Sequence, residues 1–231
     1  MPEERPQNGN RMIRKELVHM AVSTSHLEHE HSSIPLRIAK GHFATNNCHV
    51  NYYVDMTYTK HRLAEAHAAA KELVQKYDKS KPVDTVLCLE GTEVLGTCIA
   101  EELTEAGITI TNEHKTIYVV TPETASGNQT IFRGNTAHLI RNRHVLILAA
   151  TVATGAMLLD AIHAVKYYGG IPEGICAVFS AGTRCGGLPI TSIFTADVLG
   201  DFMYVRADEC PLCKAGVKLD ALVNSFGISS L

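Results

Sequence analysis

The chain of 231 residues lacks several features that mark whole classes of protein. No apolar run is long enough to span a membrane, and the first ten residues, MPEERPQNGN, contain no apolar signal-peptide segment. Positive charge is not in excess either, because 21 Lys and Arg stand against 24 Asp and Glu. We therefore expect neither a membrane nor a nucleic acid as partner. The lack of tryptophan excludes nothing.

A disulfide framework is also not indicated, since the chain has seven cysteines, an odd number. An odd number of cysteines in a chain of this length favours a reducing, cytoplasmic compartment. The composition, 45% hydrophobic and 19% charged, is typical of a globular protein. The length predicts one α/β domain with an added piece.

Periodicity divides the chain into three parts. Residues 1–33 are predicted to be a polar leader with a short N-terminal helix, and residues 34–80 a small hood with a linking helix. The hood strands are expected at Leu36–Ala44 and Val50–Asp55, and the helix at Lys60–Tyr77. Residues 81–231 are predicted to form the core and a C-terminal tail.

Within this core, apolar runs alternate with helical patterns. The predicted strands are Thr85–Leu89, Ile117–Val120, Val145–Leu148 and Ile175–Phe179, and Thr121–Asn135 is expected to be a polar loop. Such alternation favours a parallel sheet flanked by helices, with ligands at the carboxyl ends of the strands.

The most informative segment is His144–Gly155, HVLILAATVATG, which is typical of a strand buried on both faces. A loop, Thr151-Val152-Ala153-Thr154-Gly155, leads from it into a predicted helix. Helix N-terminal N–H groups, two hydroxyls and a glycine that permits close approach suit a phosphate dianion. The alternative is a tight turn with threonine as the N-cap.

This segment resembles the signature of the type I phosphoribosyltransferases, in which an apolar strand leads through an acidic pair to an Ala/Thr-Thr-Gly loop. Further segments resemble the orotate phosphoribosyltransferase branch in the same order: Lys40–Phe43, Asn51–Asp55, Leu89–Gly96, Thr121–Asn135 and Cys210–Gly216. The resemblance implies a parallel sheet flanked by helices, a small N-terminal hood and a homodimer. It also implies that the loop binds the 5′-phosphate of phosphoribosyl pyrophosphate, and that the acidic pair holds the ribose hydroxyls and hydrated Mg²⁺.

The chain departs from this pattern at three places. Ala149 and Ala150 occupy the positions of the acidic pair, and Thr121–Asn135 has no basic residue before Arg133, where the orotate branch carries a lysine. Carboxylates also stand in the segment that corresponds to the pyrophosphate loop, and each would repel pyrophosphate by about 1–4 kcal/mol at protein-like dielectric. These changes predict little or no orotate phosphoribosyltransferase activity, so Mg²⁺ is expected only if the chain is catalytically active.

The pyrophosphate-loop position is Glu90-Gly91-Thr92-Glu93. Its two carboxylates either contact a ligand or, for Glu93 above all, stabilise the first turn of the following helix. In the hood, Asn51, Tyr52 and Tyr53 are candidates for contact with a base or sugar, and alternating burial of a strand is the other interpretation.

One metal site is a weak candidate. Cys210 and Cys213 form a CxxC pair, which supplies two of the four ligands that zinc requires. Cys48, Cys185 or histidines would have to complete it, and two plain thiols are the alternative.

Three functions remain open, each with a small phosphorylated molecule as partner. The first is binding of a 5′-phosphorylated ribosyl ligand or nucleotide without the usual catalysis. The second is an active but divergent phosphoribosyltransferase on a pyrimidine-like base. The third is hydrolysis of a nucleotide's N-glycosidic bond, with Glu90 or Glu93 as a general base or oxocarbenium stabiliser.

Overall fold

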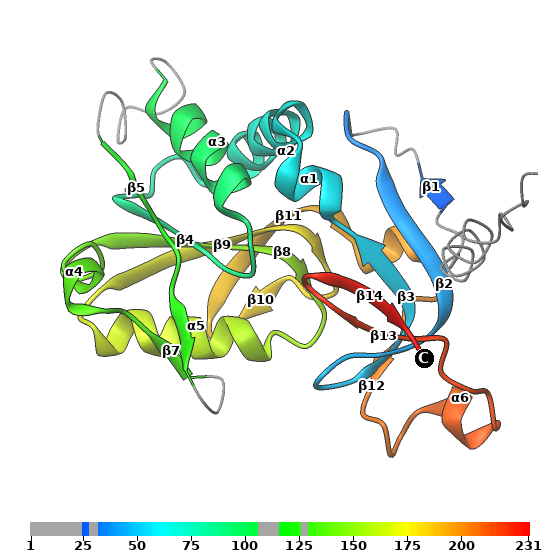
Figure 1. The fold of residues 1–231 in the computed structure, drawn as a ribbon. Helices are drawn as coiled ribbons and strands as arrows, with labels where there is room; N and C mark the ends of the chain where they lie inside the picture. The colour runs from blue at the N-terminus through cyan, green and yellow to red at the C-terminus, as the bar shows by residue number, and fades with distance from the viewer. Residues whose placement is uncertain (1–24, 28–31, 106–115, 126–128) are drawn as a thin grey trace, which may run out of the picture.

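A computed structural model describes residues 25–27, 32–105, 116–125 and 129–231 (Figure 1). The predicted leader lies almost wholly outside these residues, as does its helix. Among the described residues, no helix is both long enough and apolar enough to cross a membrane.

The core is a six-stranded sheet in the order β10-β11-β9-β8-β4-β5. The strands are β4 (Thr85–Cys88), β5 (Tyr118–Val120), β8 (His144–Val152), β9 (Ile171–Ser180), β10 (Arg184–Cys185) and β11 (Leu188–Thr195). All neighbours are parallel except β10, which is antiparallel to β11. The four predicted core strands are therefore confirmed, with β8 and β9 longer at both ends than their apolar centres.

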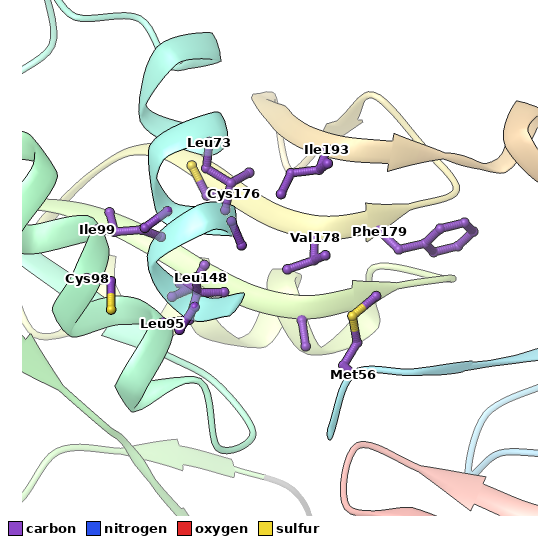
Figure 2. Packing of buried hydrophobic residues seen from close by; sticks show 14 of the residues in the cluster. Met56, Leu73, Leu95, Cys98, Ile99, Leu148, Cys176, Val178, Phe179 and Ile193 are labelled. Carbon is purple, nitrogen blue, oxygen red and sulfur yellow. The ribbon is translucent and has the colours of Figure 1, made fainter. Parts of the chain in front are cut away.

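Helices cover both faces of this sheet (Figure 1). They are α2 (Leu63–Lys76) and α3 (Glu93–Thr104) on one face and α5 (Ala156–Tyr167) on the other. Alternate residues of β8 enter the two apolar layers: Leu148 packs with α2 and α3, while Ile147 packs with α5. Figure 2 shows the first layer, in which Leu73, Leu95 and Leu148 lie between the helices and the strands.

The hood is a second sheet, in the order β12-β3-β2-β13-β14, with β1 paired to β2. Its strands are β1 (Ser25–Leu27), β2 (Leu36–Ala44), β3 (His49–Asp55), β12 (Tyr204–Val205), β13 (Ala221–Asn224) and β14 (Gly227–Ser230). Figure 1 shows the C-terminal strands beside the N-terminal ones. The hood is therefore built from both ends of the described chain, whereas the sequence analysis placed the tail with the core.

Two local predictions need correction. The helix expected at Lys60–Tyr77 is two helices, α1 (Thr57–His61) and α2, separated at Arg62, whose backbone is extended with φ −95° and ψ 112°. The segment Thr121–Asn135 contains an antiparallel pair, β6 (Glu123–Ala125) with β7 (Gln129–Ile131), and begins α4 (Gly134–Ala137). The remaining short elements are the 3-10 turn η1 (Ala196–Leu199) and α6 (Pro211–Lys214).

Candidate functional site

A pocket of about 200 Å³ lies between the carboxyl end of β8 and the hood. Residues 151–158 line one side, and hood residues of β3, the β2–β3 turn and the β13–β14 turn line the other. The carboxyl edge of a parallel sheet is where ligands bind in α/β proteins. The predicted phosphate loop and part of the predicted hood site therefore face the same cavity.

The predicted loop is shorter than expected, because β8 continues through Val152. Thr151 and Val152 pair with β9, so the turn itself is Ala153-Thr154-Gly155. Gly155, not a threonine, is the N-cap of α5, and its φ of 76° is a conformation that favours glycine. A Cβ atom at this position would lie 3.1 Å from the Cys185 Sγ atom.

The first turn of α5 completes this wall of the pocket. Ala156, Met157 and Leu158 all line the cavity, and first-turn N–H groups have no acceptor inside their own helix. Thr154 is exposed, and its hydroxyl oxygen lies 3.4 Å from the Ala156 N–H group, too far to satisfy that donor fully. The wall therefore offers N–H groups, a hydroxyl and the positive end of a helix dipole.

The two alanines that replace the acidic pair have different surroundings. Ala149 is completely buried in the layer that packs against α5. Ala150 points to the other face and lines a smaller cavity of about 70 Å³, together with Thr151 and Lys60. A side chain at position 150 reaches a cavity, but one at position 149 meets the apolar core.

Of the four residues at the predicted pyrophosphate-loop position, only Glu90 lines the main pocket. Its φ is +52° and that of Gly91 is +78°, so two successive residues adopt the left-handed conformation, which is costly for glutamate. Thr92 is buried, and its hydroxyl donates to the Leu89 carbonyl at 2.9 Å. Glu93 is in the first turn of α3 and accepts a hydrogen bond from the Thr121 hydroxyl at 3.0 Å.

Glu90 has the perturbed acidity expected of a functional group. Burial raises the pKa of its carboxyl, and this effect outweighs a hydrogen bond with Ser225 and the positive charge of Lys60, which lower the pKa. The Glu90 carboxyl therefore keeps its proton to a higher pH beside the pocket than it would in water.

Lys60 is a residue that the sequence analysis missed. It lies near the end of α1, only 3% exposed, and its Nζ atom donates to the Ser225 carbonyl at 2.7 Å. Burial lowers its pKa, while the charges of Glu90, Glu93 and Asp55 oppose that shift. The positive charge of Lys60 therefore lies near the two carboxylates of the segment 90–93. No sequence signal separates this lysine from an ordinary exposed one.

The three predicted hood residues divide into two groups. Asn51 uses its amide to hold the chain before β12, because it donates to the Asp201 carbonyl at 2.6 Å and accepts from the Met203 N–H at 2.7 Å. Tyr52 and Tyr53 line the pocket. The Tyr52 hydroxyl donates to the Asp201 carboxylate at 2.6 Å, and burial raises the pKa of Tyr53 to about 12.

Cys210 and Cys213 lie together at the start of α6, beside His42 and His49 of the hood. The other cysteines named as possible partners, Cys48 and Cys185, are not members of this group. The CxxC motif indicated the pair, but only the pairing of the tail with the hood shows which histidines it meets.

Comparison with known proteins decides the fold family. No protein-family model matches the sequence. The chain is 26% identical over 189 residues to an orotate phosphoribosyltransferase of Chlorobium phaeobacteroides (strain DSM 266 / SMG 266 / 2430), covering 80% of this chain and 88% of that protein. The crystal structure of orotate phosphoribosyltransferase from Aeropyrum pernix matches 71% of this chain and 92% of its own, with 16% identity and a TM-score of 0.50. This is a type I phosphoribosyltransferase fold.

The resemblance noted in the sequence, nearest the orotate branch, is thereby confirmed. The crystal structure of Mycobacterium tuberculosis H37Rv orotate phosphoribosyltransferase in complex with inorganic phosphate also matches, at 21% identity and a TM-score of 0.46, over 66% of this chain and 83% of that one. The pocket described above lies between the core sheet and the hood of this fold. The chemistry of this pocket has to be argued from the residues that line it, because a fold does not determine a function.

Proposed function

We propose that this orotate phosphoribosyltransferase-like protein binds a 5′-phosphorylated ribosyl ligand, such as a nucleoside monophosphate, in the main pocket. One observation carries the proposal: a single cavity runs from the turn 153–155 to Tyr52 and Tyr53 of the hood. One end of the cavity is lined by the polar groups of a helix start and the other by aromatic rings. A phosphate and a base attached to one ribose need these two different surroundings.

The phosphate would occupy the end formed by the turn and α5. Among the described residues that line the main pocket, Glu90 carries the only formal charge, so the phosphate would be held by neutral donors. Backbone N–H groups at a helix N-terminus and the Thr154 hydroxyl are suitable donors. Gly155 keeps side-chain bulk away from this point.

The base would occupy the hood end, which combines aromatic rings with side-chain amides. Tyr52, Phe179 and Phe202 supply apolar faces, and Asn46 and Asn224 supply amides. A side-chain amide donates and accepts hydrogen bonds, as the edge of a pyrimidine or purine requires.

We further propose that displacement of pyrophosphate with Mg²⁺ is not the main activity. Neither Ala149 nor Ala150 can hold metal-bound water or accept hydrogen bonds from ribose hydroxyls. The Lys60 Nζ atom, which would lie 3.3 Å from a Cβ atom at Gly91, is directed to the Ser225 carbonyl. Within residues 32–105, 116–125 and 129–231, the groups around the pocket thus suit a phosphate better than they suit a pyrophosphate leaving group with its metal ion.

Calorimetric titration tests the proposal. The full chain would be titrated with uridine monophosphate, orotidine monophosphate, phosphoribosyl pyrophosphate with and without Mg²⁺, uridine and free phosphate. We expect a monophosphate to bind more tightly than its nucleoside, and Mg²⁺ to change the affinity for phosphoribosyl pyrophosphate little.

The matched variants are Thr154→Val in the turn and Thr97→Val on the exposed side of α3. Thr154→Val should weaken binding of the monophosphate by about 1–3 kcal/mol, since it removes a hydrogen bond to a charged group. Thr97→Val should leave the affinity unchanged. Equal affinity of both variants for the phosphorylated ligand would mean that the turn is only structural.

Hydrolysis of the N-glycosidic bond is a second candidate, favoured by one observation. Glu90 faces the pocket in a strained backbone conformation, and burial raises its pKa. A protonated carboxyl there would pass its proton to the departing base as the N-glycosidic bond breaks. Water would add to the sugar carbon and return a proton to the carboxylate, giving the free base and ribose 5-phosphate. Release of base from a nucleoside monophosphate, abolished by Glu90→Gln with binding retained, would support it. Glu93 does not line this pocket, so its substitution serves as the control.

A further inference from the structure

Four side chains from distant parts of the chain converge outside the pocket. His42 lies near the end of β2 and His49 begins β3, while Cys210 is the N-cap of α6 and Cys213 lies within that helix. One donor atom from each lies within 4.8 Å of every other. Histidine and cysteine are the ligands of closed, structural zinc sites.

The distances fit a tetrahedron around one ion. The His42 Nε2 atom lies 3.1 Å from His49 Nδ1, 3.4 Å from Cys210 Sγ and 3.6 Å from Cys213 Sγ, and the last sulfur lies 3.3 Å from His49 Nδ1. With the usual zinc–ligand lengths, a regular tetrahedron has edges of about 3.3 Å between two nitrogens and about 3.6 Å between nitrogen and sulfur. The observed separations agree with these edges.

The tautomer of His42 also fits a metal ligand. Its Nδ1 atom lies 3.0 Å from the Val217 carbonyl, which can only accept, so the ring proton is on Nδ1. The Nε2 atom then has a single lone pair, yet His49, Cys210 and Cys213 all approach it. A cation at the centre satisfies all four, and a carbonyl that fixes the tautomer is the usual support of a metal-bound histidine.

We propose that His42, His49, Cys210 and Cys213 bind one Zn²⁺ ion that holds the C-terminal tail to the hood. Two sulfur and two imidazole ligands favour zinc over the hard cations Mg²⁺ and Ca²⁺. Four protein ligands leave no open position for water or substrate, so the ion is structural.

The site joins segments that the fold must bring together. His42 and Cys210 are 168 residues apart in sequence. Next to them, Asp220 accepts a hydrogen bond from the His42 N–H group at 2.8 Å and donates one to the His42 carbonyl at 2.8 Å. The tail then continues into β13, which pairs with β2. The ion would therefore fix the register of the C-terminal strands in the hood sheet.

Metal analysis of the full chain, purified under reducing conditions without a histidine tag, tests the site. We expect about one zinc ion per chain, as a four-ligand site requires. Cys213→Ser should lose this zinc. Cys213 is exposed, so its replacement leaves the packing intact. The control is Cys48→Ser, a cysteine between the two histidines in sequence that is not part of the group, and it should retain the zinc.

Two measurements on the unmodified chain keep the test independent of the variants. Removal of zinc by a chelator should lower the midpoint of thermal unfolding, and replacement by Co²⁺ should produce the absorption bands of thiolate and tetrahedral coordination. A metal-free protein that binds no Co²⁺ would overturn the proposal. So would a disulfide between Cys210 and Cys213, zinc retained by Cys213→Ser, or an unfolding midpoint that zinc removal does not change.

Discussion

The two alanines at the end of β8 allow a direct test of which of these two positions can hold a carboxylate. Ala149 is fully buried against α5, while Ala150 lines the smaller cavity with Lys60. We expect Ala149→Asp to destabilise the protein severely and Ala150→Asp to be tolerated. A carboxylate at position 150 faces a cation, but one at position 149 has only apolar neighbours.

The magnitude follows from the burial of Ala149. A fully buried carboxyl has its pKa raised by about 3–5 units, and each unit corresponds to about 1.4 kcal/mol. At about pH 8 the Ala149→Asp variant should therefore lose about 4–6 kcal/mol, a large part of the 5–15 kcal/mol of a typical domain. Because the folded-state pKa is raised above the unfolded one, the folded state binds more protons between the two values. Stability should fall as pH rises through that window.

Urea unfolding at about pH 5 and about pH 8 measures this effect, because the midpoint reports the free energy of unfolding at each pH. Ala149→Asn is the matched control: it has a similar volume and no charge, so it should show the pH dependence of the natural chain. Equal stability of Ala149→Asp and Ala149→Asn at the higher pH would refute the reasoning. It would mean that position 149 reaches water, and that an acidic pair could be restored there.

Three further predictions concern single contacts. Glu65→Gln should destabilise the chain by about 2–4 kcal/mol in urea unfolding, because it breaks a largely buried pair with Arg37, whose Nη1 atom lies 2.7 Å from a Glu65 carboxylate oxygen. Arg37 also holds the pKa of Glu65 below its ordinary 4.5, so this contribution should be present above pH 4.5 and fade as pH falls through the folded-state pKa. Gly155→Ala should cost about 1–2 kcal/mol in the same assay, because φ is 76° there. Lys60→Met should raise the pKa of Glu90 further, since it removes a charge that lowers it, and carbon-detected NMR titration would show this.

Each of these predictions has a contrasting outcome. Glu123→Gln breaks the exposed pair with Arg133 and should cost less than about 1 kcal/mol, so an equal loss in Glu65→Gln would show that burial adds nothing. Gly134→Ala has open space at its Cβ position, and it should be neutral. Similar losses for Gly134→Ala and Gly155→Ala would argue against backbone strain at the N-cap. An unchanged or lower pKa of Glu90 in Lys60→Met would remove the lysine as its electrostatic partner.

Local signals in the sequence were sufficient for most of the core. The bounds of β2 were predicted residue for residue, and the apolar centres of β4, β8 and β9 were found, because burial on both faces leaves continuous apolar runs. The extension of β8 to Val152 was missed, since Thr151 is a typical loop residue as well as a strand former. Thr151 belongs to the strand because it pairs with β9. The break at Arg62 has no glycine or proline to mark it.

Long-range pairing explains what could not be predicted. No local pattern shows that β13 lies beside β2, because the paired residues, Ala221 with Phe43 and Leu222 with Ala44, are far apart in sequence. The position of Lys60 against the Ser225 carbonyl depends on the same pairing. The strand, turn and helix at one end of the pocket were accordingly predicted from local sequence, because they follow one another in the chain. The hood end could not be predicted in this way, because both ends of the described chain build it.

The conformation of the turn 153–155 does not depend on an acidic pair in β8. The turn is fixed by the pairing of Thr151 and Val152 with β9 and by the left-handed Gly155, and neither depends on the residues at positions 149 and 150. Alanine fits both positions because β8 is covered on two faces. Alanine at positions 149 and 150 therefore leaves the N-terminus of α5 directed at the pocket. The first-turn N–H groups of α5 remain available to an anion, and we propose on this ground that binding of a phosphate does not require the acidic pair.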